Sequence, residues 1–483
     1  MASDILVEVE TDRSEGLETS PPALQKILPV VAVLGVLAFL GYTLTEGSSN
    51  SRFIQVGMTL GLLVYLATFV DVVLGLAFLI LCIGLSPELS LGGMNDLRLE
   101  DFIIPALLLA WLTRTLRGRE PVAHVPFKGP AIIYFATLVF SSILGLSAGT
   151  TQLSAALPLI AKSIEYYLIL LIVANNIRTE SEFKALVVFS VLVAMAGSIF
   201  GADRAFADLA PDPTNRMQGP LGETATIFGG YLALTLSIVV GLFLHCRTQG
   251  QRVLAGTAIV TLSAAILYTY SRTSYAALTV GLIVFGFLKE RRLLIIILLL
   301  AVLLPILAPE SIIARFSTIG DVATGPGPSS WVARVEAWQW AVARMNGTDF
   351  LWGKGAGSVR LGDVDNEYVR VVVDTGLLGL AIFLWMLARI GRSANDLYKS
   401  LDSETFSKGY AAGYLIAFFT LVVHAIAATS FTSIRTMECF MLMTGFTLCL
   451  AHHREAWHLG DLQKPLDRDP IFLPAIEPPR RTS

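Results

Sequence analysis

The chain has 483 residues, of which 54% are hydrophobic and 15% are charged, and its mean hydropathy is +0.66. Because soluble domains carry about 25% charged residues, this composition excludes a string of soluble domains and indicates a membrane protein. The net charge of −3 gives no reason to expect a nucleic-acid partner.

Apolar runs long enough to cross a membrane recur along the chain. The hydrocarbon core of a bilayer, about 30 Å thick, needs about 17–25 apolar residues in one helix. Two runs, Val72–Leu85 and Phe102–Leu116, are short enough for half-helices, so the predicted fold is an all-α, polytopic transmembrane helix bundle of about 12–14 spans. The predicted spans are Ile27–Leu44, Phe53–Val70, Val72–Leu85, Phe102–Leu116, Pro130–Ser147, Leu153–Val173, Phe183–Phe200, Thr226–His245, Val253–Tyr270, Thr273–Leu288, Leu293–Ala308, Val372–Ala388, Gly409–Ala428 and Ile434–Leu450.

Basic residues predict the orientation, because loops rich in Lys and Arg stay in the cytoplasm. Most of the 35 Lys and Arg fall in alternate loops and in the two tails, which places both termini in the cytoplasm. The predicted segments are a disordered acidic tail (1–26), the first part of the bundle (27–308), a large and partly helical extracytoplasmic loop (309–371), the last spans (372–451) and a Pro-rich tail (452–483).

The loops on the opposite side carry almost only arginine, and among their basic residues Lys354 alone is a lysine. Arginine presents a fixed fork that binds phosphate or carboxylate through two hydrogen bonds, which lysine cannot do. Snorkelling of arginine to lipid headgroups is the simpler alternative. In this orientation Arg216, Arg272, Arg334 and Asp365 all face one compartment.

The large outer loop contains a predicted amphipathic helix. Its apolar residues recur at spacings of four and three, and Arg334 lies off this stripe. The stripe consists of Trp331, Val335, Trp338, Val342 and Met345. Such a helix lies on the membrane surface or caps a cavity, and a lid without chemistry is an equal alternative.

A glycine run and an acidic stretch follow this helix. The glycine run 353–358 allows close backbone approach but lacks the GxxxxGK[ST] pattern of a phosphate loop. Asp363, Asp365 and Glu367 directly precede a hydrophobic helix, where each carboxylate costs desolvation unless it is paired or used. The acidic stretch is therefore the stronger functional signal.

Some charged residues lie within or beside the spans. Lys162 and Glu165 have the spacing i, i+3, which predicts an ion pair on one helix face and leaves a functional and a structural role open. His424 and Glu438 lie near the outer ends of the last two spans, with Arg435 beside them. We expect His424 to be a packed, hydrogen-bonded residue, and a general base is the second interpretation. The four cysteines lack metal-binding spacing and are interpreted as packing residues, so no disulfide, metal or other cofactor is expected.

In their order and their position relative to the spans, several short pieces resemble the bacterial O-antigen ligase and Wzy-type polysaccharide polymerase superfamily. The similar pieces are 86–89, 97–101, 162–166, 175–177, 216–219, 229–232, 270–274, 353–357, 365–368 and 374–379. Many ligases of this superfamily carry a His-Asn pair where this chain has Asp365-Asn366, which favours the polymerase side.

The resemblance implies a metal-independent, inverting glycosyltransferase of the bacterial inner membrane with its active site on the periplasmic face. Such enzymes transfer a glycan from undecaprenyl diphosphate to an acceptor hydroxyl. The acceptor is another lipid-linked repeat unit for polymerases and a lipid A core for O-antigen ligases. The implied partners are the lipid-linked glycan donor, the sugar acceptor and membrane lipids, together with flippase and chain-length regulator proteins.

This chemistry assigns roles to the outer charged residues. The diphosphate leaving group gains negative charge in the transition state, and without a metal guanidinium groups must neutralise it. Arg216 and Arg334 are assigned to this catalytic role, and Asp365 is assigned to accept the proton of the acceptor hydroxyl. Glu223 and His424 are reserve candidates for the base, and Asn366 and Tyr368 are expected to bind sugar hydroxyls. The full set of substrate-binding candidates is Arg272, Glu223, Asn366, Tyr368, Lys162, Glu165, His424 and Arg435.

A transporter or lipid-linked glycan flippase is the alternative from another class, and it would explain the fourteen candidate spans and the Lys162–Glu165 pair. A transporter predicts charges along the bilayer midplane and an inverted repeat. Here the charges crowd the outer loops, and no fixed-period repeat is visible in the sequence.

Overall fold

The structure is a computed structural model. It describes residues 59, 62–67, 71–85, 89–91, 94–118, 122–206, 216–219, 223–307, 313, 329–359, 363–402 and 405–463. The predicted span Ile27–Leu44, most of Phe53–Val70 and the tail predicted over 1–26 lie outside these residues, as does most of the tail predicted over 452–483.

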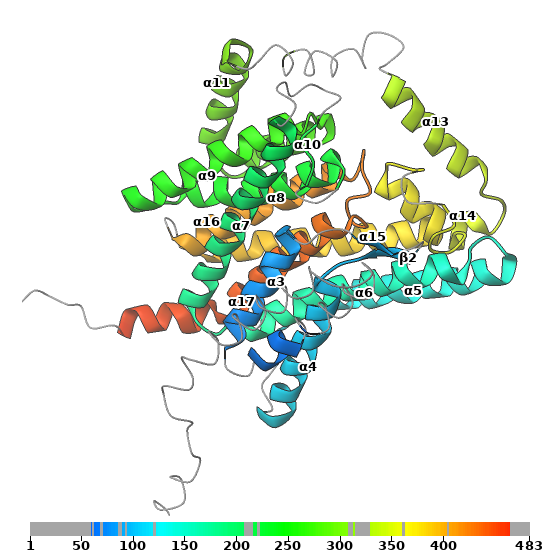
Figure 1. Ribbon diagram of the computed structural model, residues 1–483, viewed down its shortest axis with the longest axis horizontal. Coiled ribbons are helices and arrows are strands. Elements are labelled where there is room, and N and C mark those ends of the chain that lie inside the picture. The colour runs from blue at the N-terminus through cyan, green and yellow to red at the C-terminus, as the bar shows by residue number, and fades with distance from the viewer. Residues whose placement is uncertain are drawn as a thin grey trace, which may run out of the picture.

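Every predicted span from Val72–Leu85 onwards coincides with a helix, so the all-α bundle is confirmed (Figure 1). The helices are α3 (Val72–Leu85), α4 (Glu100–Gly118), α5 (Lys128–Ala148), α6 (Leu153–Asn176), α7 (Glu180–Phe206), α8 (Ala225–Leu244), α9 (Gln249–Tyr268), α10 (Arg272–Leu288), α11 (Arg291–Leu307), α13 (Ser329–Ala343), α14 (Asp349–Trp352), α15 (Glu367–Ser400), α16 (Phe406–His424) and α17 (Ile434–Gln463). Two short antiparallel strands, β1 (Leu89–Leu91) and β2 (Met94–Leu97), form a hairpin before α4.

Eight of the described helices are long and apolar enough to cross a membrane: α5, α6, α7, α8, α9, α15, α16 and α17. Two shorter apolar helices, α3 and α10, accompany them. The described part of the chain is thus a polytopic membrane helix bundle. The predicted loop 309–371 contributes α13 and α14 to it.

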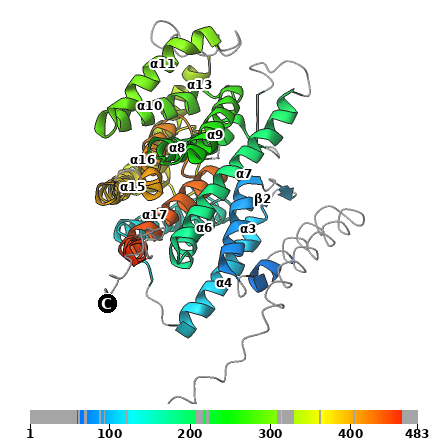
Figure 2. The same ribbon diagram turned by 90° about the vertical axis from the view of Figure 1, so that its left-hand side faces the viewer.

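Helices α8, α16 and α17 form the centre of the bundle (Figures 1 and 2). Most of the apolar stretch of each helix is buried, 72% for α8 and α16 and 89% for α17. In the peripheral α9, only 22% of the apolar stretch is buried. Glycines allow the closest approach, because a Cβ at Gly241 of α8 would overlap the backbone at Gly409 and Gly413 of α16. Small residues at such crossings let membrane helices pack backbone to backbone.

Helix α15 is interrupted, and the glycine run fits into the interruption. Gly376 has φ 72° and ψ −176°, which breaks the helix about two and a half turns after its start at Glu367. The break frees backbone carbonyls, and Lys354 N donates to Val373 O (2.8 Å) while Gly355 N donates to Asp374 O (3.0 Å). The glycine run therefore fixes the loop before α15 to the bundle.

Because successive helices alternate in direction, the turns before α6, α8, α10, α15 and α17 meet at one end of the bundle, here called the loop face. Backbone hydrogen bonds link these turns: Met217 N donates to Tyr268 O, and Glu367 N donates to Ala425 O, each at 2.9 Å. Helices α13 and α14 lie at this end, toward the right of Figure 1.

Candidate active site

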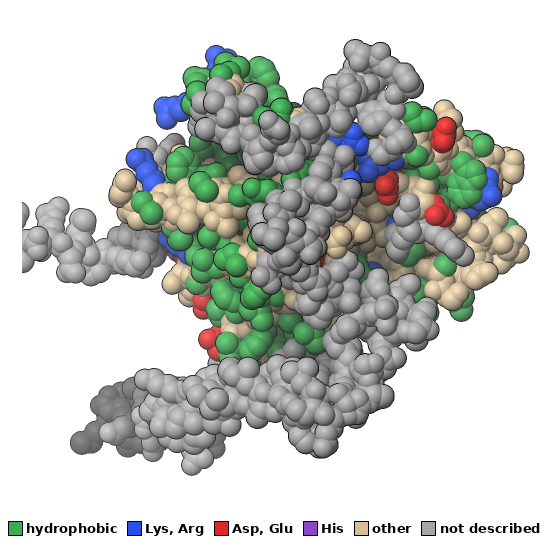
Figure 3. All heavy atoms as spheres, turned by 45° about the horizontal axis from the view of Figure 1, so that its top comes forward, with side chains coloured by type: hydrophobic (Ala, Val, Ile, Leu, Met, Phe, Trp, Pro, Cys, Tyr) green, Lys and Arg blue, Asp and Glu red, His purple; other side chains and the backbone are tan. Residues whose placement is uncertain are grey.

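Three arginines from separate segments gather on the loop face. Arg216 precedes α8, Arg272 is the first residue of α10, and Arg334 lies in α13. Both Arg334 and Arg216 act electrostatically on Arg272, so the Arg272 guanidinium group lies near each of the other two. We call Arg216, Arg272 and Arg334 the arginine group. Figure 3 shows basic side chains gathered beside acidic ones on the side of the molecule where α13 and α14 lie.

Local structure places each member of this group. The N-cap Ser271 begins α10, since its side chain accepts a hydrogen bond from Ser274 N, and Arg272 follows directly. Arg216 lies beside the same turn because the next residue, Met217, is hydrogen-bonded to Tyr268. Arg272 and Arg216 are therefore held together by backbone geometry.

Two residues of the predicted stripe, Trp338 and Met345, pack against the segment before α15 and the start of that helix. Ala341 and Met345 form a small core with Val364 and Val373, and Trp338 packs against it. The end of α13 and the residues after it therefore lie against the start of α15. On the neighbouring face, Arg334 Nε lies 3.4 Å from Asp365 Oδ2.

Asp365 is partly open to solvent, with 42% of its side chain exposed, whereas its neighbours are engaged in the protein. Asn366 Oδ1 accepts a hydrogen bond from Val369 N (3.0 Å) and caps α15. Tyr368 donates its hydroxyl to Val422 O (2.7 Å), and Glu367 accepts from Phe431 N and Thr432 Oγ1. The side-chain oxygens of Asn366 and Tyr368, expected to bind sugar hydroxyls, thus have partners within the protein.

His424 is the packed, hydrogen-bonded residue that the sequence predicts. It is 2% exposed; Ser274 Oγ lies 3.2 Å from its Nε2, and Ser430 Oγ lies 2.7 Å from its Nδ1. A Cβ at Gly230 would press on the imidazole ring, so glycine makes room for it. Arg334 acts electrostatically on His424, so the histidine lies near this member of the arginine group.

Glu223 and Arg435 lie in a buried ion network. Glu223 Oε1 is 3.0 Å from Arg98 Nη2 and 2.5 Å from Arg435 Nε, and these side chains are at most 1% exposed. Arg98 Nη1 is also 3.4 Å from Glu100 Oε1. We call Arg98, Glu100, Glu223 and Arg435 the buried network.

The predicted pair of Lys162 and Glu165 is confirmed, with an N–O distance of 3.0 Å. Lys162 also bonds to Asp101, which the spacing within one span could not indicate. Glu438, fully buried, acts electrostatically on Lys162. These charges lie next to the buried network, since Glu438 interacts with Glu100 and Arg98.

Arg370 and Asp374 have no role predicted from the sequence, although Asp374 begins one of the pieces that carry the resemblance. Arg370 Nε lies 3.4 Å from Asp374 Oδ2, and both line a cavity of about 50 Å³ together with Tyr134 and Tyr166. The spacing i, i+4 at the start of a predicted span was the available signal.

The fold and the site define a class: a polytopic membrane protein that gathers arginine and a carboxylate on one end of its helix bundle. Residues 257–384, from α9 into α15, match the family model Wzy_C, described as O-antigen ligase. This segment of the membrane helix bundle is thus similar to the O-antigen ligase domain, in agreement with the resemblance stated from the sequence. No curated protein matches the chain.

The matched segment contains Arg272, Arg334 and Asp365. Members of this family are glycan ligases or polymerases of bacterial membranes, and the family implies lipid-linked glycan substrates.

Proposed function

We propose that this protein polymerises undecaprenyl-diphosphate-linked oligosaccharide repeat units, as a Wzy-like glycosyltransferase acting on the periplasmic face of the inner membrane. The observation that carries the proposal is the arginine group beside Asp365 on the loop face. Within these four residues the formal charge is +2, from three guanidinium groups and one carboxylate. Such a positively charged, open site suits a diphosphate that is released without a metal ion.

In the proposed step, the acceptor hydroxyl attacks the anomeric carbon of the donor glycan. Its oxygen forms the new glycosidic bond with inversion, the proton passes to the Asp365 carboxylate, and the bond to the diphosphate oxygen breaks with its electron pair. Arg216 and Arg334 neutralise the charge that grows on the diphosphate, supported by Arg272.

The ion pair between Arg334 and Asp365 implies that the donor diphosphate binds before Asp365 accepts the proton. Arg334 contacts Asp365 at 3.4 Å, so a diphosphate that takes over Arg334 frees the carboxylate to accept a proton. Glu223 is a weaker choice for the base because it is enclosed between Arg98 and Arg435. His424 is enclosed between Ser274 and Ser430. Both stay reserve candidates.

An O-antigen ligase that transfers polymer to a lipid A core is the second candidate, since the matched family carries that description. The intermediate that accumulates in cells lacking the protein separates the candidates. A single unpolymerised repeat on its carrier supports the polymerase, and a full-length chain on its carrier supports the ligase. Glycan trapped on the cytoplasmic leaflet would instead indicate a flippase and overturn both.

The proposed orientation has its own test. Thr348→Cys introduces an exposed thiol beside α14, and Gln249→Cys introduces one on the α8–α9 turn at the opposite end. We expect a membrane-impermeant maleimide to label Thr348→Cys in intact spheroplasts and Gln249→Cys only after lysis. The reverse pattern would place the arginine group in the cytoplasm and end the proposal.

A further inference from the structure

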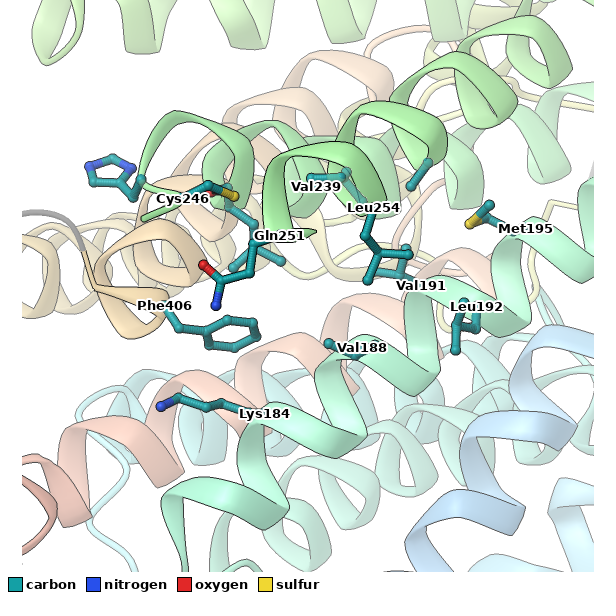
Figure 4. Close-up of a pocket in the computed structure, with 14 residues that line it drawn as sticks. Lys184, Val188, Val191, Leu192, Met195, Val239, Cys246, Gln251, Leu254 and Phe406 are labelled. Atoms are coloured by element: carbon teal, nitrogen blue, oxygen red, sulfur yellow. The ribbon is translucent and has the colours of Figure 1, made fainter. Parts of the chain in front are cut away.

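An apolar groove lies between α7, α8 and α9, at the end of the bundle opposite the loop face (Figure 4). Its cavity measures about 220 Å³. Its polar lining residues are Lys184, His245 and Gln251, toward one end, and the rest of the lining is apolar. The groove takes no part in the proposed chemistry.

The length of the groove corresponds to one leaflet of a bilayer. Along α7 its lining runs from Lys184 to Met195, which at 1.5 Å per residue is about 16 Å. Half of a hydrocarbon core is about 15 Å. Leu192 on one wall and Leu254 on the other are 45% and 48% exposed, so the groove opens sideways where lipid would lie. These dimensions suit an acyl chain that enters from the polar end.

The polar end of the groove carries excess positive charge. Lys184 pairs with Glu180 at 2.8 Å, but exposed pairs of this kind contribute little, so an anion can compete for the lysine. The charged residues at the starts of α7 and α9 have a formal sum of +2, and they are Arg178, Lys184, Arg247, Arg252, Glu180 and Glu182. Basic residues at a membrane surface attract anionic headgroups.

We propose that this groove binds one anionic phospholipid of the surrounding membrane, with an acyl chain along α7 and its headgroup phosphate at Lys184 and the α8–α9 turn. The bound lipid fills the space between α7 and the peripheral α9, and it thereby supports the helix that leads to Arg272. The site is independent of the glycan donor, whose diphosphate the proposed function places at the other end of the bundle.

Cys246 provides a reporter of occupancy. It lines the groove and is half-buried, whereas Cys82, Cys439 and Cys449 are buried elsewhere in the bundle. The full-length protein is placed in nanodiscs of phosphatidylcholine alone or mixed with phosphatidylglycerol, and alkylation of Cys246 by N-ethylmaleimide is followed by mass spectrometry. We expect alkylation to be about fivefold slower with phosphatidylglycerol, the preference that a single Lys or Arg provides near anionic lipid.

Two variant pairs test the two halves of the site. Lys184→Gln with Arg252→Gln should abolish the difference between the two lipids, whereas Arg291→Gln with Arg292→Gln, which removes the same charge at the start of α11, should preserve it. Ala258→Phe fills the aliphatic part and should lower the phosphatidylglycerol retained in native mass spectra. Val260→Phe, at a position 70% exposed on the same helix, should not.

Equal alkylation rates in both lipids for the wild type would overturn the proposal, as would an unchanged lipid preference in the Lys184/Arg252 double variant. Protection of Cys246 by a polyprenyl phosphate, but not by phosphatidylglycerol, would assign the groove to the carrier tail instead. Because the charge variants lie at the surface, they test the proposal even where Ala258→Phe fails to fold.

Discussion

Two clusters of arginine and carboxylate lie at the same end of this bundle, and they differ in exposure and in charge balance. In the buried network, Glu223 is shared by Arg98 and Arg435, and none of these side chains is more than 1% exposed. On the loop face, Arg334 is 26% exposed and its partner Asp365 is 42% exposed. In this open cluster the cations outnumber the carboxylate.

The difference separates structural charge from charge that is available to a ligand. A buried ion must be neutralised by its neighbours, because removing it from water costs several kcal/mol. The buried network meets this requirement and ties the β-hairpin, the segment before α8 and the start of α17 together. In the arginine group, Arg334 and its partner Asp365 are both partly exposed, so water or an anion can reach this pair. Substitutions in the two clusters should therefore have different consequences.

The largest effect is expected for Asp365→Asn. Asparagine keeps the shape of the side chain but cannot accept a proton, so turnover should fall about 10²–10⁴-fold. Donor binding should persist, because Arg334 is released from its partner. Turnover by purified protein and binding of the lipid-linked donor are measured separately. Asp363→Asn, two residues earlier and exposed, is the matched control. Unchanged turnover in Asp365→Asn would move the base to Glu223 or His424.

Arg216→Ala or Arg334→Ala should lower turnover about 10²–10³-fold, the usual cost of removing one group that stabilises a developing anion. Polymer should disappear from cells, while the protein still inserts and elutes as a folded species. Arg344→Ala removes an arginine from the same stretch of chain, where it stacks on Trp340 with 3.6 Å to the ring centre, and should retain activity. Polymer of normal length in both arginine variants would remove their catalytic assignment.

In the buried network the expected loss is one of stability. Glu223→Gln leaves Arg98 and Arg435 without their shared carboxylate, which should cost about 3 kcal/mol and lower the melting temperature in detergent. Glu438→Gln is the comparison, because within the described residues neither carboxyl oxygen of Glu438 has a hydrogen-bond partner to lose. It should melt closer to the wild type. Equal destabilisation by both substitutions would contradict the distinction drawn between them.

The helices, the amphipathic α13 and the Lys162–Glu165 pair could be predicted because each depends on residues close together in the sequence. Apolar runs and fixed spacings carry that information directly. The gathering of Arg216, Arg272 and Arg334 could be predicted only as a shared side of the membrane, since their proximity depends on how α13 docks on α15.

Contacts between segments that are far apart in the sequence could not be predicted from it. Glu223 meets Arg98 and Arg435 across more than a hundred residues in each direction, so its role in the buried network has no local signal. The glycine run 353–358, taken alone, was also weak evidence for a particular role. Its function becomes apparent only beside the helix break at Gly376, where its amides satisfy the carbonyls of Val373 and Asp374.

The smallest effect, and the finest test of the open site, is expected at Asn366. Its side chain caps α15, so Asn366→Ala should cost about 1 kcal/mol of stability and let Asp365 move, with turnover falling severalfold and the KM for the donor unchanged. Asn366→Asp supplies another capping oxygen and should restore both properties. If Asn366→Asp is instead as impaired as Asn366→Ala, while melting like the wild type, the amide itself contacts the substrate. Asn366 would then bind a sugar hydroxyl, and the start of α15 would contain ligand-binding groups as well as structural ones.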